Sequence, residues 1–289
     1  MLRFTPLVCC ALLALLTLCA LAQSRPSILI NHRNTDITKL SLADIQRAKQ
    51  QLHIAYGHTS HGSQITAGME GLVAFASAGG GGLKLPANTF AFNLGGHNGA
   101  LDLQDGGLGG DVGSYPQWVE RTRKYLDNPD HAKCNVIMWS WCGQVTSKFK
   151  DKTLASEYLE PMTQLEKDYP RVTFVYMTGH LDHGSDADNK AANQMIRDYC
   201  AKNGKVLFDF ADIEQYDPDG KFYEFANDNC DYYSSASGNK IGNWAKQWQD
   251  AHTEGKDWYN CRSAHSEPLN ANQKAYAAWA MFVEIAKRK

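Results

Sequence analysis

The chain has 289 residues, of which 43% are hydrophobic and 21% are charged, and this is the composition of a globular protein with a sizeable core. Collagen-like, coiled-coil and intrinsically disordered chains are excluded. The 31 acidic and 29 basic side chains give a formal charge of −2 and form no long run of one sign, so nucleic acid is not an expected partner.

The first 22 residues have the pattern of a signal peptide. A nearly continuous apolar run over residues 7–20 leads into Ala20-Leu21-Ala22, which matches a small-residue cleavage site before Gln23. The run is shorter than the ~20 residues that a membrane-spanning helix needs, and we expect no membrane span. Lipidation at Cys19 is the weaker alternative. We therefore expect residues 23–289 to be a single domain that is secreted or periplasmic.

Residues 23–289 alternate short apolar runs with helical patterns. The runs predicted to be strands are Leu52–Tyr56, Thr89–Leu94, Asn135–Trp141, Val172–Thr178 and Lys205–Phe210. The segments predicted to be helices are Ser63–Ala78, Pro116–Leu126, Leu154–Asp168, Lys190–Asn203 and Ala271–Lys287. Because parallel strands need crossover connections, this alternation predicts a three-layer α/β/α fold with a mainly parallel sheet.

Two regions interrupt the alternation. The glycine-rich segment Gly95–Gly113 is predicted to be a loop without a strand. Residues from about 212 to 259 form an acidic, aromatic-rich insertion, and an insertion of this length usually has a function or a structure of its own. Within it, Asp217–Gly220 is expected to be a plain turn, with the start of a calcium loop as the alternative.

Histidines gather behind the predicted strands. Ligands of open parallel sheets bind at the carboxyl ends of the strands, and five of the ten histidines follow such an end. The residues at these positions are His58, Ser60, His61 and Gly62, then Gly96, His97 and Asn98, then Trp141, Cys142 and Gln144, and finally His180, Asp182 and His183. A sixth histidine, His265, precedes the last predicted helix. We expect these side chains to line one cleft.

Three of these segments resemble the sequence blocks of the SGNH hydrolases, also called the GDSL family. Gly57–Gly62 is similar to the block with the serine nucleophile, Asn93–Gly99 to the block with an oxyanion-hole glycine, and Arg262–His265 to the block whose histidine precedes the last helix. The resemblance implies a flavodoxin-like α/β hydrolase that needs no cofactor. It also implies a serine carbohydrate esterase or deacetylase whose substrate is a polysaccharide or another glycan.

The resemblance gives each candidate residue a role. Ser60 is the expected nucleophile and His265 its general base, and Asp182 is the expected acid because Arg262 stands where the family has its own. The residues expected to bind the oxyanion or the substrate are Gly62, Gly96, Asn98, Gln144, His58, His61, His97, Trp141 and His180. Trp141 is expected to be exposed, because it lies where the third predicted strand leaves the sheet.

Three alternatives stay open at this point. The hydroxyls of Thr59, Ser60 and Ser63 fit the N-cap of the helix that follows them. A glycan-binding protein without turnover would use aromatic side chains of this region and of the insertion. A metal-dependent hydrolase or lyase would hold a divalent ion such as zinc with histidines and carboxylates. The candidate ligands are His58, His61, His180 and His183, with His97, His265, Asp111 and Asp182 as further donors.

Removal of the leader leaves five cysteines in an oxidising compartment. Cys230 and Cys261 flank a polar segment near the C-terminus and are the expected disulfide. Cys134 and Cys200 each precede a predicted strand and form the candidate for a second pair. Cys142 is then the unpaired thiol.

Overall fold

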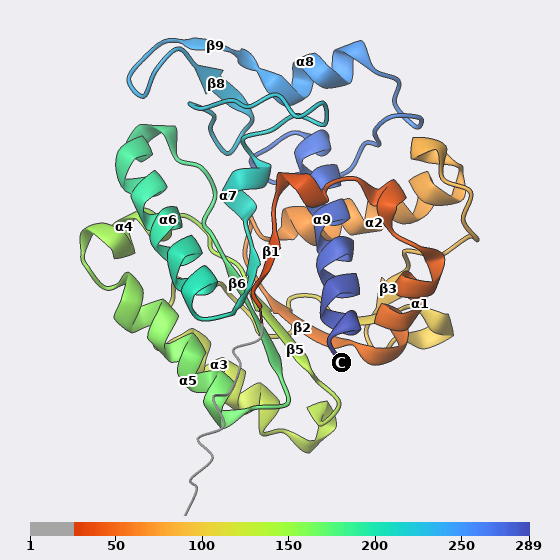
Figure 1. Cartoon of the computed structure of the whole chain (residues 1–289), viewed down its shortest axis with the longest axis vertical. Helices are drawn as coiled ribbons and strands as arrows, with labels where there is room; N and C mark the ends of the chain where they lie inside the picture. Colours follow the sequence, from red (N-terminus) through yellow and green to blue (C-terminus); the bar gives the residue numbers. More distant parts are fainter. Residues whose placement is uncertain (1–25) are drawn as a thin grey trace, which may run out of the picture.

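The computed structural model describes residues 26–289 (Figure 1). The predicted signal peptide and its cleavage site lie outside these residues. None of the described helices is long and apolar enough to cross a membrane.

A seven-stranded sheet forms the centre of the molecule. Its strands are β1 (Ile28–Ile30), β2 (His53–Gly57), β3 (Phe92–Asn93), β4 (Leu101–Gln104), β5 (Val136–Trp139), β6 (Thr173–Met177) and β7 (Val206–Phe208). They lie in the order β1-β7-β6-β5-β2-β4-β3, and every neighbouring pair is parallel. All four residues of β5 are buried, because helices cover both faces of a sheet of this kind.

Helices form the two outer layers, so the predicted three-layer α/β/α fold is confirmed (Figure 1). The helices on one face of the sheet are α1 (Leu42–Gln51), α2 (Ser63–Ser77) and α9 (Pro268–Lys287), and those on the other are α3 (Gln117–Leu126), α4 (Val145–Lys150), α5 (Glu160–Asp168) and α6 (Asp186–Lys202). A Cβ atom on Gly68 of α2 would lie 2.2 Å from the carbonyl oxygen of Ala271 in α9. Glycine is therefore required where these two helices touch.

The structure corrects the prediction for the second strand. Of the predicted run Thr89–Leu94, only Phe92–Asn93 pairs in the sheet, and the glycine-rich segment predicted to contain no strand includes β4. β4 has only four residues, which alternate between buried and half-buried, so its hydrophobic signal is weak. Asp102 of β4 pairs with His53, the first residue of β2. The turn between β3 and β4 therefore lies at the amino end of the sheet.

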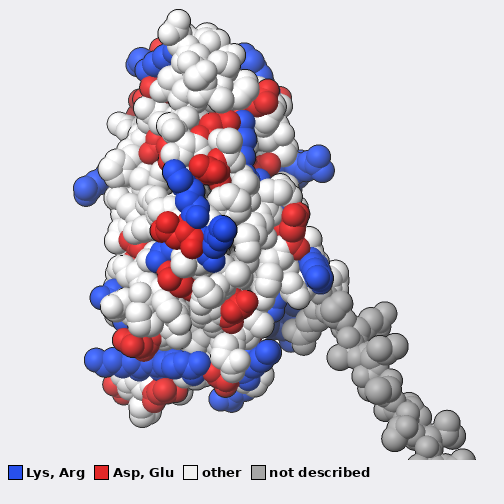
Figure 2. Space-filling model, turned by 90° about the vertical axis from the view of Figure 1, so that its left-hand side faces the viewer, with Lys and Arg blue, Asp and Glu red and all other residues white. Residues whose placement is uncertain are grey.

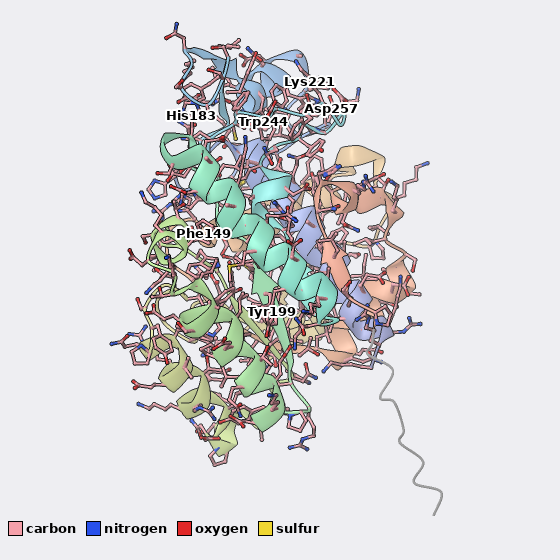
Figure 3. The ribbon with its side chains drawn as sticks, turned by 60° about the vertical axis from the view of Figure 1, so that its left-hand side comes forward. Phe149, His183, Tyr199, Lys221, Trp244 and Asp257 are labelled. Carbon is pink, nitrogen blue, oxygen red and sulfur yellow. The ribbon has the colours of Figure 1, made fainter. Side chains whose placement is uncertain are left out.

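The insertion folds into a cap over the carboxyl end of the sheet (Figure 1). The chain leaves β7 through α7 (Phe210–Ile213), forms the antiparallel strands β8 (Asp231–Tyr233) and β9 (Lys240–Asn243), and continues into α8 (Trp244–Ala251). A second, smaller core, in which Tyr223 and Trp244 of the cap pack with Leu181 and Leu269 of the main body, stabilises this cap. Figure 3 shows Trp244 inside the cap and His183 at its border with α6.

The predicted turn at Asp217–Gly220 is part of the cap. Asp217 Oδ1 accepts hydrogen bonds from the backbone N–H groups of Asp219 and Lys221, and its Oδ2 accepts one from the Tyr223 hydroxyl. The carboxylate thus satisfies groups of its own turn, as Asp commonly does in such turns.

The structure does not contain the predicted disulfide. All five cysteines of residues 26–289 are free thiols. Cys230 lies in the core of the cap, 3.2 Å from the Ser266 hydroxyl oxygen. Cys261 packs against the main core, where its sulfur lies 3.5 Å from Nδ2 of Asn272. The two sulfur atoms therefore belong to different packing clusters.

Lys and Arg side chains are interspersed with Asp and Glu over the face shown in Figure 2. Exposed ion pairs of the described chain include Lys246 with Asp250 and Lys287 with Glu284. Pairs of this kind contribute little to stability because water screens them.

Candidate active site

The loops after β2 and β5 meet at the point where the strand order reverses. Numbered along the chain, β4-β2-β5-β6-β7 have the order 2-1-3-4-5, which is the flavodoxin-like order. Sheets of this type bind ligands at the carboxyl ends of the strands beside the first strand, where crossovers leave in opposite directions. The loop after β2 holds Ser60 and His61, and the loop after β5 holds Cys142.

Close packing dictates the glycines around Ser60. A Cβ atom on Gly57 would lie 2.3 Å from the indole ring of Trp139, and one on Gly62 would lie 2.0 Å from Ser140 Oγ. Both contacts join the end of β2 to β5, so larger residues would push the two loops apart. The pattern Gly57–Gly62 thus reflects packing of two neighbouring strand ends, which also brings their side chains together.

The hydroxyls in this turn do not cap the helix that follows. α2 begins after Gly62 and has no side-chain cap. The Thr59 hydroxyl donates to Asp111 Oδ2 at 2.8 Å, Ser63 donates to the carbonyl oxygen of Ser60 at 2.7 Å, and Ser60 Oγ lies 3.6 Å from Cys142 Sγ. The N-cap interpretation of these residues is therefore wrong.

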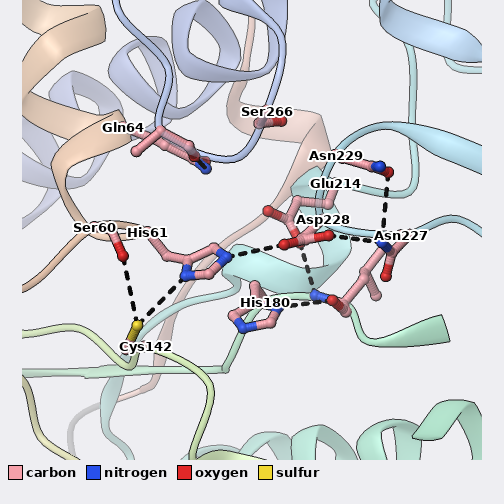
Figure 4. Close-up of polar contacts among 12 residues, drawn as sticks. Ser60, His61, Gln64, Cys142, His180, Glu214, Asn227, Asp228, Asn229 and Ser266 are labelled. Carbon is pink, nitrogen blue, oxygen red and sulfur yellow. Dashed lines mark hydrogen bonds and ion pairs between the residues drawn. The ribbon is translucent and has the colours of Figure 1, made fainter. Parts of the chain in front are cut away.

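A thiol, an imidazole and a carboxylate form a chain at this edge (Figure 4). Cys142 Sγ lies 3.6 Å from Nδ1 of His61, and Nε2 of the same ring lies 2.9 Å from Asp228 Oδ2. Asp228 comes from the cap, in the segment before β8. The arrangement is that of a nucleophile, a base and the acid that orients the base.

The charge state of His61 suits a base. Its ring is buried, with 9% of the side chain exposed. This burial and the nearby His180 lower the pKa of His61 below the ordinary 6.5, although the hydrogen bond that His61 donates to Asp228 acts in the opposite direction. Burial opposes ionisation of Asp228, but its hydrogen bond to His61 and the charges of His61 and His180 lower the pKa of Asp228. A carboxylate only accepts hydrogen bonds, so Nε2 of His61 carries the proton and Nδ1 keeps its lone pair toward Cys142.

Two further imidazoles lie against the His61 ring. The ring of His180 stacks on it with centroids 3.8 Å apart, and that of His265 with centroids 4.6 Å apart. Nδ1 of His180 lies 2.7 Å from the carbonyl oxygen of Leu181 and donates to it, which leaves a lone pair on Nε2. The predicted hydrogen bond between Ser60 and His265 does not occur among residues 26–289, and the loop after β2 instead meets the segment before α9 through His61 and His265.

Asp111 fixes the loops on either side of the thiol. Its carboxylate accepts hydrogen bonds from Thr59, from the Gly113 backbone and from Gln144 Nε2. Gln144 Oε1 in turn accepts the backbone N–H of Cys142 at 3.1 Å. Asp111 thus connects the loops after β2, β4 and β5, and Gln144 acts on the backbone of Cys142 instead of as a free oxyanion donor.

A buried ion pair supports the histidines from behind. Lys274 of α9 and Glu214 after α7 are fully buried and 2.6 Å apart. Glu214 Oε2 accepts the backbone N–H of Leu181, next to His180, and Lys274 also donates to Gln64. Gln64 Nε2 donates to the Ala264 carbonyl oxygen at 2.5 Å, next to His265. The network therefore holds the His180 and His265 segments against α2 and α9.

The structure places three predicted residues at the wrong edge for this site. Gly96, His97 and Asn98 lie in the turn between β3 and β4, where Gly95 donates its backbone N–H to Asp102. Asp102 pairs with the amino end of β2. These three residues were predicted at the carboxyl edge because the second strand was predicted to end just before them. In the structure the chain reaches the carboxyl edge only after β4, and not after β3.

Four other candidates have structural surroundings of their own. His58 lies 2.7 Å from Asp105, and Nε2 of His183 lies 3.0 Å from the Ser235 carbonyl oxygen. Trp141 is buried, contrary to the predicted exposure, since its indole N–H donates to the carbonyl oxygen of Met177. No hydrogen bond joins Asp182 to His265 among residues 26–289. The contact that the structure shows for the Ser60 hydroxyl is the one to Cys142.

The possible metal ligands differ from the predicted set. Within the described chain, His61, His180 and Asp228 have ligand atoms within 4.8 Å of one another, whereas His58 and His183 lie outside this group. The rings of His61 and His180 are nearly parallel, with an interplanar angle of 11°. A metal ion lies in the plane of an imidazole that binds it, so one ion does not fit both rings as they stand. The same side chains already fit a base and its acid.

Sequence reasoning missed Asp228 and gave Cys142 no role. Asp228 lies in the run Asn227–Asn229 of the insertion, far along the chain from Ser60 and His61. The signal for it was the length and acidity of the insertion, which did not single out one residue. Cys142 did carry a signal, as the unpaired thiol directly after a predicted strand.

Comparison of the chain with protein-family models, with curated proteins and with solved structures gave no match. The resemblance to the SGNH hydrolases therefore remains a prediction.

Proposed function

We propose that the protein is a hydrolase of acyl compounds that uses Cys142 as nucleophile, His61 as general base and Asp228 as the acid that orients His61. One observation carries the proposal: the chain from Cys142 through His61 to Asp228, with contacts of 3.6 and 2.9 Å. It lies at the edge of the sheet where α/β enzymes bind ligands.

The roles follow from the positions of protons and lone pairs. Nδ1 of His61 takes the thiol proton while the sulfur attacks the acyl carbon, and the resulting imidazolium gives that proton to the leaving group. Asp228 stabilises the imidazolium and holds the ring in the required tautomer. Water then hydrolyses the thioester, again with His61 as base.

The turn before α2 offers donors for the developing oxyanion. The backbone N–H groups of His61 and Gly62 precede the first helical residue, and residues 26–289 supply no acceptor for them. Such groups at a helix N-terminus stabilise negative charge. The predicted role of Gly62 fits this position.

Ser60 remains the alternative nucleophile. Its hydroxyl lies 3.6 Å from the sulfur, and the sulfur is the atom that contacts the base. A thiol also ionises more readily than a hydroxyl. We therefore assign the attack to Cys142 and a supporting hydrogen bond to Ser60.

The proposed substrate remains an ester or amide of undefined acyl group. The prediction of a glycan substrate comes from the resemblance to the SGNH hydrolases. The separate alternative, a glycan-binding protein without turnover, relies on exposed aromatic side chains, but Trp118, Trp139, Trp141 and Trp244 are buried. The carbohydrate esterase or deacetylase thus stays a prediction, and the glycan-binding alternative loses these four side chains as platforms for sugar rings.

Class-selective inhibitors test the proposal. The reduced protein is assayed with a p-nitrophenyl ester before and after treatment with iodoacetamide, and in parallel with a fluorophosphonate. Alkylation of the thiol should remove turnover, and the serine-directed reagent should leave most of it. If the fluorophosphonate removes activity and iodoacetamide does not, the nucleophile is Ser60 and the proposal is wrong.

A further inference from the structure

The proposed nucleophile and base have the spacing of two ligands on one zinc ion. Zinc binds thiolate sulfur at ~2.3 Å and imidazole nitrogen at ~2.0 Å, and at a tetrahedral angle these two ligand atoms lie about 3.5 Å apart. Cys142 Sγ and Nδ1 of His61 are 3.6 Å apart. A zinc ion therefore fits between them in place of the thiol proton.

We propose that Cys142 and His61 bind a thiophilic divalent metal ion, zinc above all, and that this ion inhibits the hydrolase because it occupies the nucleophile and the base. The inhibition rests on the proposed function, whereas the binding does not. On binding, the S–H bond of Cys142 breaks, its proton goes to solvent, and a bond from sulfur to the metal forms.

The surroundings of His61 are those of a metal-bound histidine. Nε2, the nitrogen away from Cys142, donates to Asp228 at 2.9 Å. Ligand histidines usually donate their second N–H to a carboxylate or a carbonyl group, which fixes the ring and strengthens the metal bond. Asp228 thus acts from outside the coordination sphere here.

His180 is the nearest third ligand. Its Nδ1 donates to the carbonyl oxygen of Leu181, so Nε2 is the nitrogen with a free lone pair. The two imidazoles are stacked, and a tilt of the His180 ring out of the stack would direct Nε2 toward an ion held by His61. Water or the Ser60 hydroxyl, 3.6 Å from the sulfur, completes four ligands.

Cobalt is the probe for binding, because it replaces zinc and reports a thiolate ligand by a near-ultraviolet charge-transfer band. Chelator-treated, reduced protein titrated with Co²⁺ should develop this band up to one ion per chain, and Zn²⁺ should abolish it. The band should disappear in Cys142→Ser and persist in Cys134→Ser, which removes a thiol distant from the site. Circular dichroism checks that each variant folds.

The second variant pair tests the histidine arrangement. Asp228→Asn should weaken cobalt binding about 10–100-fold, the usual effect of removing such a supporting carboxylate. His183→Ala is the matched control, since His183 bonds to Ser235 and stacks on Tyr233. A band that survives in Cys142→Ser, or equal binding in the Asp228 variant, overturns the inference.

Activity separates this inference from the proposed function. In a p-nitrophenyl ester assay, zinc should lower the rate in proportion to the occupied sites, and a chelator should restore it. A rate that rises with zinc overturns the inference in favour of a metal-dependent hydrolase. Cobalt bound through Cys142 by a protein that hydrolyses no ester would keep the metal site and refute the proposed function. An active enzyme that binds no cobalt would keep the proposed function and refute the metal site.

Discussion

Two edges of the sheet each bring a histidine and an aspartate together. At the amino end, Nδ1 of His53 lies 2.7 Å from Asp102 Oδ2, and at the carboxyl end, Nε2 of His61 lies 2.9 Å from Asp228 Oδ2. The first imidazole is 32% exposed and the second only 9%. The two pairs have similar hydrogen-bond distances. They differ in burial and in the group that faces the other ring nitrogen of the histidine.

A cysteine also lies near each pair, and the two thiols have different partners. Cys134 lines the same cavity as His53, but its thiol donates to the Val136 carbonyl oxygen, and burial raises its pKa to about 11. Cys142 instead faces Nδ1 of His61. Of these two His–Asp pairs, only the one at the carboxyl end of β2 has the geometry that the proposed mechanism needs, because the free nitrogen of His61 faces a thiol.

Removal of the Cys142 thiol should lower turnover more than any other substitution. Cys142→Ala should lower kcat/KM for an activated ester by about 10⁴-fold or more, because the nucleophile is removed. Cys134→Ala should keep turnover close to that of the wild type. Steady-state kinetics of both purified variants measures the contrast, and equal losses would mean that the two edges do not differ as described.

Substitution of His61 and of His53 should have effects on kcat/KM that differ nearly as much. His61→Ala should reduce kcat/KM by roughly 10²–10⁴-fold, the usual contribution of a general base. His53→Ala should change it little, because the His53–Asp102 pair lies at the opposite edge. The same ester assay applies, and an active His61→Ala enzyme would remove the proposed base.

Substitution of Asp228 and of Asp102 should also have different effects on kcat, with a smaller difference than for the histidines. Asp228→Asn should lower kcat by about 10²-fold or more, because an amide can bond to the wrong tautomer of His61. Asp102→Asn should leave kcat near the wild-type value. Thermal unfolding of both variants controls for stability, and a fall in kcat that only follows a fall in melting temperature would argue against a role for Asp228.

The smallest effect concerns pH. His61 must be neutral to act as base, and because its pKa is lowered, kcat/KM should hold from neutral pH to below pH 6.5 before it falls. His180→Ala removes the neighbouring imidazole that, together with burial, lowers the pKa of His61, so this pKa should rise and the acidic limb should move to higher pH. Glu214, Asp228 and His265 remain in place around the ring. The pH–rate profile measures this shift, with His183→Ala as the unshifted control.

The central fold was predictable because its signals are local. The apolar runs that became β2, β5, β6 and β7 are buried strands, and α2 and α9 fall within a few residues of their predicted bounds. β1 and β4, of three and four residues, carry too little hydrophobic signal. Missing β4 had a functional consequence, since it assigned the turn at Gly96–Asn98 to the wrong edge.

The site was predictable only in part, because its members come from separate segments. The position of Ser60 and His61 after β2 and of Cys142 after β5 follows from the rule for strand ends. Asp228 reaches His61 through the fold of the cap, which packs on the main body through a small second core. A contact between segments so far apart along the chain cannot be predicted from local sequence patterns. The exposure of Trp141 was misjudged because the end of β5 is covered, and its indole N–H bonds to Met177 at the end of β6.

The position of the acyl group in the acyl-enzyme intermediate distinguishes Cys142 from Ser60 as the nucleophile. The protein is mixed with p-nitrophenyl acetate, quenched in acid within the first turnover, digested, and analysed by mass spectrometry. The Cys142–His61–Asp228 arrangement predicts an acetyl group on the peptide that contains Cys142, and its absence from the Cys142→Ala variant. An acetyl group on Ser60, in the wild type and in that variant alike, would contradict it.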